Sequence, residues 1–203
     1  MCTHLPFDFR KATQALNFFA LKNSGEISKY KALKLVFFAD RFHLRKYGRP
    51  VTGDEYYAMQ RGPVPSGTKN LAEMAEDYIG DDCIAYAGGF IATPASRHVI
   101  VIKSVLAVDD RQLSESDREA LEFAWSTFGK YDDREIVEQT HFYPEWSKHA
   151  AALEKGGRAR MDLMDFLKDP PAGADPCWPL TEEERAIRQE QLRELDLIEA
   201  MWS

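Results

Sequence analysis

The sequence predicts a predominantly helical α+β fold: a compact helical domain with a small antiparallel β-hairpin or sheet, followed by a C-terminal helix. Apolar residues recur at helical spacing in several segments, one β-branched run alternates as a strand does, and a proline-rich stretch precedes the last helix. The 203 residues, 44% of them hydrophobic, are enough for one sizeable core. We expect a domain at 1–167, a linker at 168–180 and an acidic amphipathic helix at 181–203.

The first two helices are predicted at Phe9–Leu21 and Lys29–Tyr47. Ser28 is suited to cap the second helix, and Gly48 is suited to end it. This second helix is apolar around most of its surface, which is typical of a buried central helix. Its basic residues are expected to form one solvated edge, on the face shared by Lys34, Arg41 and Arg45.

The middle of the chain predicts a mixture of elements. We expect a short helix at Thr68–Gly80, a β-hairpin at Cys83–Leu106, and a helix at Leu113–Gly129 capped by Ser114 or Ser116. A further short helix is expected at Asp132–Phe142.

The C-terminal part has a different composition. Four prolines between Lys168 and Pro179 exclude a regular element there, so this stretch is expected to be a flexible linker. The last helix carries seven acidic and three basic residues, so it holds over half of the net charge of −7. Four of its apolar residues fall near one face: Ile187, Leu195, Ile198 and Trp202.

Composition also limits the class of protein. The net charge of −7 disfavours nonspecific binding to DNA, and no apolar run is long enough to span a bilayer. The N-terminus lacks the layout of a signal peptide, and the three cysteines form no C-x-x-C pair. These observations predict a reduced, cytoplasmic protein that uses no cofactor.

The stretch RGPVPSGTKN, Arg61 to Asn70, is close in letters to a phosphate-binding P-loop. Pro63 and Pro65 remove two of the backbone N–H donors that such a loop supplies, and Thr68 and Lys69 stand in swapped order. The stretch therefore predicts a rigid turn that leads into a helix.

Asp40 is the acid that calls for an explanation, because its helix face is apolar. A buried carboxylate needs hydrogen-bond donors. We favour a structural acid that hydrogen-bonds loop N–H groups or an arginine, over a general base that works with His43.

Other catalytic or metal-binding patterns are weak. The five histidines show no zinc spacing, so a zinc site would need distant pairing, and no nucleophile motif is present. His141 and Trp146 indicate a packed corner in which the indole N–H donates to a backbone carbonyl. The basic segment Lys29–Arg49 favours either a solvated helix face or a surface for nucleic acid or an acidic partner.

Part of the chain resembles the Panacea, or SocA-like, antitoxin domain, from about Phe9 to about Ala150. The most specific matching pieces are Ala39-Asp40-Arg41, His43-Leu44, Tyr47-Gly48-Arg49-Pro50, Thr52-Gly53-Asp54, Ala58-Met59 and Gly62-Pro63-Val64-Pro65. Leu113-Ser114 and the stretch from Thr140 to Trp146 also fit. The linker and the last helix match no hallmark of that family.

The resemblance implies a bacterial antitoxin that binds and neutralises its own toxin, usually encoded beside it. Neutralisation would occlude the toxin, or deliver it to a ClpXP-type protease with the antitoxin as adaptor. The resemblance implies motif positions at Asp40, Arg41, Gly48, Gly62, Pro63, Pro65, His141 and Trp146. In the family setting, Asp40 is expected to anchor the RGPVPSG loop through its N–H groups.

Several partner assignments remain open at this stage. Arg45, Arg49 and the apolar residues of the last helix are the candidates for partner binding. The helix is equally suited to pack on its own domain or to form a homodimer. Rival functions are a nucleic-acid-binding regulator that uses Lys29–Arg49 and an enzyme that uses Asp40 with His43 or His141.

Overall fold

The computed structural model describes residues 7–94, 100–171 and 177–202, without the side chains of Asp196 and of residues 198–202. The chain forms the predicted predominantly helical α+β fold. In order, its elements are α1 Phe9–Lys22, β1 Glu26–Ser28, α2 Lys29–Tyr47, β2 Tyr56–Met59, β3 Gly62–Pro65, α3 Ser66–Ala72, α4 Asp81–Phe90, β4 Ile91–Ala92, β5 Val101–Ser104, η1 Asp110–Gln112, α5 Glu115–Phe128, α6 Asp133–His141, α7 Pro144–Ser147, α8 Ala150–Leu153, β6 Ala159–Arg160, η2 Leu163–Leu167 and α9 Glu182–Trp202.

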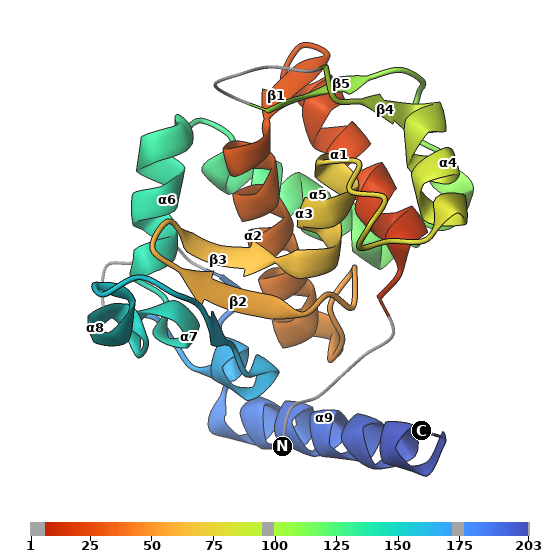
Figure 1. The fold of residues 1–203 in the computed structure, drawn as a ribbon. Coiled ribbons are helices and arrows are strands. Elements are labelled where there is room, and N and C mark those ends of the chain that lie inside the picture. The colour runs from red at the N-terminus through yellow and green to blue at the C-terminus, as the bar shows by residue number, and fades with distance from the viewer. Residues whose placement is uncertain (1–6, 95–99, 172–176, 203) are drawn as a thin grey trace.

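Helix α2 runs through the middle of the molecule, as predicted (Figure 1). The Ser28 hydroxyl accepts a hydrogen bond from the N–H of Lys31, and Gly48 ends the helix in the left-handed conformation at φ 83°. Helices α1, α5 and α6 and the β2–β3 hairpin pack around α2. Burial of nearly the whole helix explains why its apolar residues have no single face.

In the described part of the chain, two small antiparallel sheets flank this core. One has the order β1-β5-β4, with Ile27 opposite Ile102, and it lies at the N-terminal end of α2. The other has the order β3-β2-β6, with Ala58 opposite Pro63. Strand β3 is an edge strand of the second sheet, which is where prolines are tolerated because no ladder N–H is needed on the open side.

The predicted hairpin at Cys83–Leu106 is wrong in its first half. Residues Asp81–Phe90 form helix α4, and the short strand β4 that follows pairs with β5 from Ile91↔Ser104. Asp81 and Asp82 in the first turn favour the helix through its dipole. The predicted strand residue Val99 lies outside the described residues.

Two other boundaries also differ from the prediction. Helix α3 ends at Ala72 rather than Gly80, because the chain turns at Met74 with a positive φ of 49°. The stretch that was expected to be a rigid turn is in part a strand, because Gly62–Pro65 forms β3 and pairs with β2. The helix at Glu115–Phe128 is confirmed, with a capping box formed by Ser114 and Asp117.

Candidate functional site

Asp40 is fully buried in α2 and is satisfied by protein donors. Its Oδ1 accepts from the N–H groups of Val51 and Thr52 at 2.8 and 3.0 Å, and its Oδ2 accepts from the Tyr56 hydroxyl at 2.8 Å and from the Thr52 hydroxyl. Burial raises the pKa of Asp40 to about 6, and these hydrogen bonds oppose the rise. Asp40 therefore accepts hydrogen bonds from loop N–H groups, as predicted for a structural acid. The segment that it anchors is Val51–Tyr56 and not the RGPVPSG loop.

Asp54 is the residue that holds the RGPVPSG stretch. Its carboxylate accepts from the N–H of Gly67 at 2.8 Å, from the N–H of Thr68 at 2.6 Å and from the Thr68 hydroxyl at 2.7 Å. Pro65 at the N-cap position of α3 has no side-chain oxygen, so Asp54 supplies the cap from another segment. The N–H groups that a phosphate would need are occupied by this carboxylate.

His43 has its own partners, separate from those of Asp40. Its Nδ1 donates to the carbonyl oxygen of Arg49 at 2.6 Å, which leaves Nε2 to accept from the Ser116 hydroxyl at 3.0 Å. Burial lowers the pKa of His43 to about 4, so the ring is neutral at physiological pH. Asp40 and His43 therefore have separate hydrogen-bond partners and fasten different parts of the chain.

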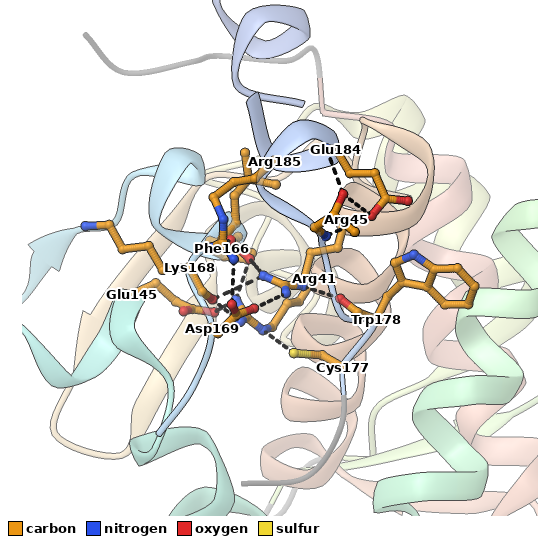
Figure 2. A network of polar contacts seen from close by, with 12 residues as sticks. Arg41, Arg45, Glu145, Phe166, Lys168, Asp169, Cys177, Trp178, Glu184 and Arg185 are labelled. Atoms are coloured by element: carbon orange, nitrogen blue, oxygen red, sulfur yellow. Dashed lines mark hydrogen bonds and ion pairs between the residues drawn. The ribbon is translucent and has the colours of Figure 1, made fainter. Parts of the chain in front are cut away.

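Arg41 and Arg45 form a clamp at the C-terminal half of α2 (Figure 2). Arg41 donates to Glu145 Oε1 and to the carbonyl oxygens of Phe166 and Lys168, each at 2.7 Å, and its Nε lies 3.2 Å from Cys177 Sγ. Both guanidinium groups are buried, and they hold the chain that leaves the core after η2.

Arg45 completes the clamp from one helical turn further on. It donates to the carbonyl oxygen of Trp178 at 2.7 Å and pairs with Asp169 at 2.5 Å, and it shares the carbonyls of Phe166 and Lys168 with Arg41. The described ends of the expected linker, Lys168–Asp169 and Cys177–Trp178, are therefore fastened to α2.

The predicted solvated edge of α2 is wrong. Lys34, Arg41 and Arg45 are exposed by only 2, 0 and 0%. Their positive charge is covered because segments far along the chain fold over them, and helical periodicity carries no information about such coverage.

This burial covers three of the seven cations of the proposed basic surface. Of those that stay near the surface, Lys29 pairs with Glu73, Lys46 with Glu119 and Arg49 with Asp117, while Lys31 lies 5.6 Å from the centre of the Trp125 ring. The paired cations weaken the case for a nucleic-acid-binding face on this helix, because the protein's own carboxylates balance their charge.

Lys34 differs from the two arginines. Its Nζ donates to the carbonyl oxygen of Pro63 at 2.6 Å, and no carboxylate lies within ion-pair distance among the described residues. Burial lowers the pKa of Lys34 to about 7. An ammonium has three donors, so this group is left only partly satisfied.

The His141–Trp146 corner is confirmed by the geometry. The two rings stack at 3.6 Å with 5° between their planes, and Trp146 Nε1 donates to the carbonyl oxygen of Met59 at 2.8 Å. This hydrogen bond ties α7 to the β2–β3 hairpin. Gly62, with φ 89°, makes the tight turn of that hairpin and leaves no room for a Cβ beside Thr140.

Helix α9 lies across the C-terminal end of α2 and packs on its own domain by one face (Figure 1). Leu192 is fully buried, Arg185 donates to the carbonyl oxygen of Leu167, and Arg188 donates to those of Arg45 and Lys46. Of the residues predicted to bind a partner, Ile187 is half exposed and Leu195 is partly buried. The side chains of Ile198 and Trp202 lie outside the described residues.

Sequence reasoning missed three buried acids that organise the site: Asp54, Asp117 and Glu145. Asp117 lies in the first turn of α5, where it completes the capping box, and it also pairs with Lys11 and Arg49. Glu145 meets Arg41, and Asp117 meets Lys11 and Arg49, across long stretches of sequence, whereas Asp54 meets Thr68 fourteen residues on. No local pattern encodes these contacts.

The described residues contain neither a candidate metal site nor a membrane-spanning helix. Among the described residues, no three His, Cys, Asp or Glu side chains gather in a way that could hold a metal ion. Within the same residues, no helix is long and apolar enough to cross a membrane.

The described part of the chain is a helical core whose buried polar groups fasten its own loops and the segment that leads to the last helix. A family model for the antitoxin SocA-like Panacea domain matches residues 33–147, more than half of the chain. The chain belongs to this family, which gives it an antitoxin role in general terms and favours a non-enzymatic one. Comparisons with curated proteins and with solved structures find no match.

Proposed function

We propose that this protein neutralises a cognate toxin by binding it directly. The observation that carries the proposal is the family match across α2, the β2–β3 hairpin and α5–α7. The roles of Asp40 and His43 support it, because both groups are used to fasten the protein's own loops. The cognate toxin is the product of a neighbouring gene.

The test is co-expression with that neighbouring product. We expect growth to be rescued and a stoichiometric complex to be recovered by affinity purification. Failure of both rescue and complex formation in cells that express soluble protein would overturn the proposal.

Delivery to a ClpXP-type protease is the second form that we propose for the same function. It predicts rescue while the toxin level falls, and loss of rescue in a host that lacks the protease. Rescue that is equal in both hosts would leave occlusion as the mechanism.

We also propose that the chain divides into a domain at 1–167, a linker at 168–180 and a helix at 181–203 with its own role. The side of α9 turned away from the domain, with Ile187 half exposed and Leu197 exposed, is available to a partner or to a second copy of the chain. Arg45 is buried, so it contributes to such an interface only by holding Asp169 and Trp178 in place.

The tail is tested by ending the chain after Leu180, which keeps the Trp178 carbonyl that Arg45 binds. Loss of toxin binding with an unchanged melting temperature would place the interface on α9. Unchanged toxin binding would exclude α9 from it, and a gel-filtration shift between the two lengths would reveal a homodimer.

A further inference from the structure

A groove runs beside the N-terminal half of α2, between that helix, the β2–β3 hairpin and α3. It consists of two adjoining hollows of about 400 and 300 Å³ that share Met59, Val64 and Lys69. We call it the Lys34 groove. Two connected hollows suit an extended segment better than a small compact molecule.

Lys34 lies in the wall of the larger hollow, where its ammonium is held by one protein acceptor. The Pro63 carbonyl oxygen accepts a hydrogen bond from one N–H of the Lys34 ammonium. The neighbouring residue, Gly62, has no Cβ, so the backbone of the hairpin can lie close to the Lys34 side chain. Buried cations in proteins are normally paired, because an unpaired one is costly. A carboxylate that enters the hollow would supply the missing acceptor.

The remaining charge of the groove is also positive. Lys29, Arg61 and Lys69 line the larger hollow, and Arg158 lines the smaller one. Among the described lining residues, Glu73 is the acid, and it pairs with both Lys29 and Lys69. On a chain with a net charge of −7, this groove is a local positive region that selects a negative occupant.

The walls of the groove are largely apolar. Tyr30, Leu33, Met59 and Val64 line the larger hollow, and the Arg61 guanidinium lies 5.2 Å from the centre of the Tyr30 ring. In the smaller hollow, Arg158 lies 4.8 Å from the Tyr57 ring, and Tyr78 is exposed. Such walls accept aliphatic side chains on either side of a carboxylate.

We propose that the Lys34 groove binds an acidic segment of a partner protein, with a Glu or Asp side chain at Lys34 and apolar neighbours on the tyrosine walls. The inference deepens the proposed function, since the partner is the toxin. Apolar walls favour a peptide over a bare phosphate, and the paired Lys29 and Lys69 leave few cations for a nucleic-acid backbone.

The first experiment titrates two pentapeptides into the full-length protein and follows amide NMR signals. The probes are Ac-Ala-Leu-Glu-Leu-Ala-NH2 and the same peptide with Gln in place of Glu. We expect saturable shifts at the groove with the Glu peptide and about tenfold weaker binding of the Gln peptide, the factor that one charge-assisted hydrogen bond supplies.

Variants then separate Lys34 from charge in general. Lys34→Met keeps the side-chain length and should bring the Glu peptide down to the affinity of the Gln peptide. Arg61→Glu, at the exposed rim, should weaken the Glu peptide as well. Lys103→Met removes a partly exposed lysine on β5 that pairs with Glu26, and it should leave binding unchanged.

Equal binding of the two peptides, no saturable shifts, or equal binding by Lys34→Met would each overturn the proposal. Rescue of growth by co-expression with the toxin is an independent test of the groove. If wild-type protein rescues growth but Lys34→Met and Arg61→Glu rescue equally well, the groove is not the interface while the proposed function stands. If wild-type protein fails to rescue, the proposed function fails, whatever the peptides show.

Discussion

The two halves of α2 bury their cations in opposite ways. At the C-terminal half, Arg41 and Arg45 are surrounded by carbonyl oxygens, Glu145 and Asp169 (Figure 2). At the N-terminal half, Lys34 is as deeply buried but meets one carbonyl, beside an open groove. The sequence places all three on one face of one helix, so the difference arises from what folds over each of them.

This difference separates a structural cation from a candidate binding cation. A planar guanidinium with five donors can bridge several chain segments at once, as the clamp does. An ammonium on a flexible stem is a point charge whose pKa burial readily lowers, and an incoming anion can raise it again. We therefore expect changes at the clamp to cost stability and changes at Lys34 to cost binding.

Arg41→Met should have the largest effect on stability. It leaves Glu145 and the Cys177 sulfur without their donor, and the carbonyls of Phe166 and Lys168 with Arg45 alone, so we expect a loss of about 3–5 kcal/mol in the free energy of unfolding. Chemical denaturation monitored by circular dichroism measures this loss. Burial raises the pKa of Glu145 even with Arg41 present, and without Arg41 the carboxyl should take up a proton.

The matched control is Arg134→Met, which removes an exposed arginine paired with Glu138 on α6. Such surface pairs contribute about 0–0.5 kcal/mol. If Arg41→Met and Arg134→Met cost the same, Arg41 is no clamp and the contrast between the two halves of α2 fails.

Asp40 directly precedes Arg41 in α2 and is the anionic counterpart of the clamp. Asp40→Ala leaves two N–H groups and two hydroxyls without their acceptor and should cost about 2–4 kcal/mol. Asp40→Asn should cost about 1 kcal/mol, because the amide oxygen still accepts and the hydroxyls can turn to accept from the NH2 group. Thermal melts that show no change for Asp40→Ala would refute the anchoring role.

The difference in stability between wild type and Asp40→Ala should depend on pH. The folded-state pKa of Asp40 is about 6, above its ordinary 3.8, so the folded protein binds a proton first as the pH falls. The advantage of wild type over Asp40→Ala should therefore widen between pH 6 and pH 4. A gap that narrows in that window would mean that the carboxylate form is the one the fold prefers.

Lys34→Met should act in the opposite direction and increase stability. Removing a buried, unpaired ammonium should raise the free energy of unfolding at pH 7 by about 1–3 kcal/mol, after the loss of the hydrogen bond to Pro63. Denaturation of wild type, Lys34→Met and the control Lys103→Met measures the gain. Destabilisation by Lys34→Met would make Lys34 a second structural cation and would break the contrast.

This gain should depend on pH. The folded-state pKa of about 7 lies below the ordinary 10.5, so between these values the unfolded chain binds more protons. Wild type then gains stability as the pH rises from 7 to 10.5, and the advantage of Lys34→Met shrinks over that range. A constant advantage would show that Lys34 keeps its proton in the folded protein over this range, as it does in the unfolded chain.

Local signals were predictable from the sequence, and long-range ones were not. Ser28, Gly48 and Ser114 set helix ends through their own backbone neighbours, so α2 was predicted with its observed bounds and α5 to within two residues at either end. A strand was predicted where helix α4 forms, which shows that a short apolar run does not distinguish a helix from a strand.

The candidate site depended on contacts between distant segments. The apolar helix face around Asp40 indicated that its carboxylate needs hydrogen-bond donors. It did not indicate that Val51 and Thr52 supply them. The clamp requires residues about 120 positions beyond Arg41 and Arg45 in the chain, and nothing in the local pattern of α2 indicates them. The resemblance to the family identified the motif positions without giving their contacts.

Gly48→Ala should have the smallest effect on stability, and it should be confined to the clamp end of α2. A residue with a side chain at φ 83° costs about 1 kcal/mol, and the added Cβ would meet the Gln191 side chain, whose flexible end can move aside. Gly88→Ala is the control, because Gly88 lies within α4 with open space around it, and it should gain about 0.5–1 kcal/mol. Because Gly48 contacts α9 and not the Lys34 groove, thermal melts should register the change while binding of the Glu peptide stays the same. A loss of peptide binding in Gly48→Ala would show that the two ends of α2 are coupled.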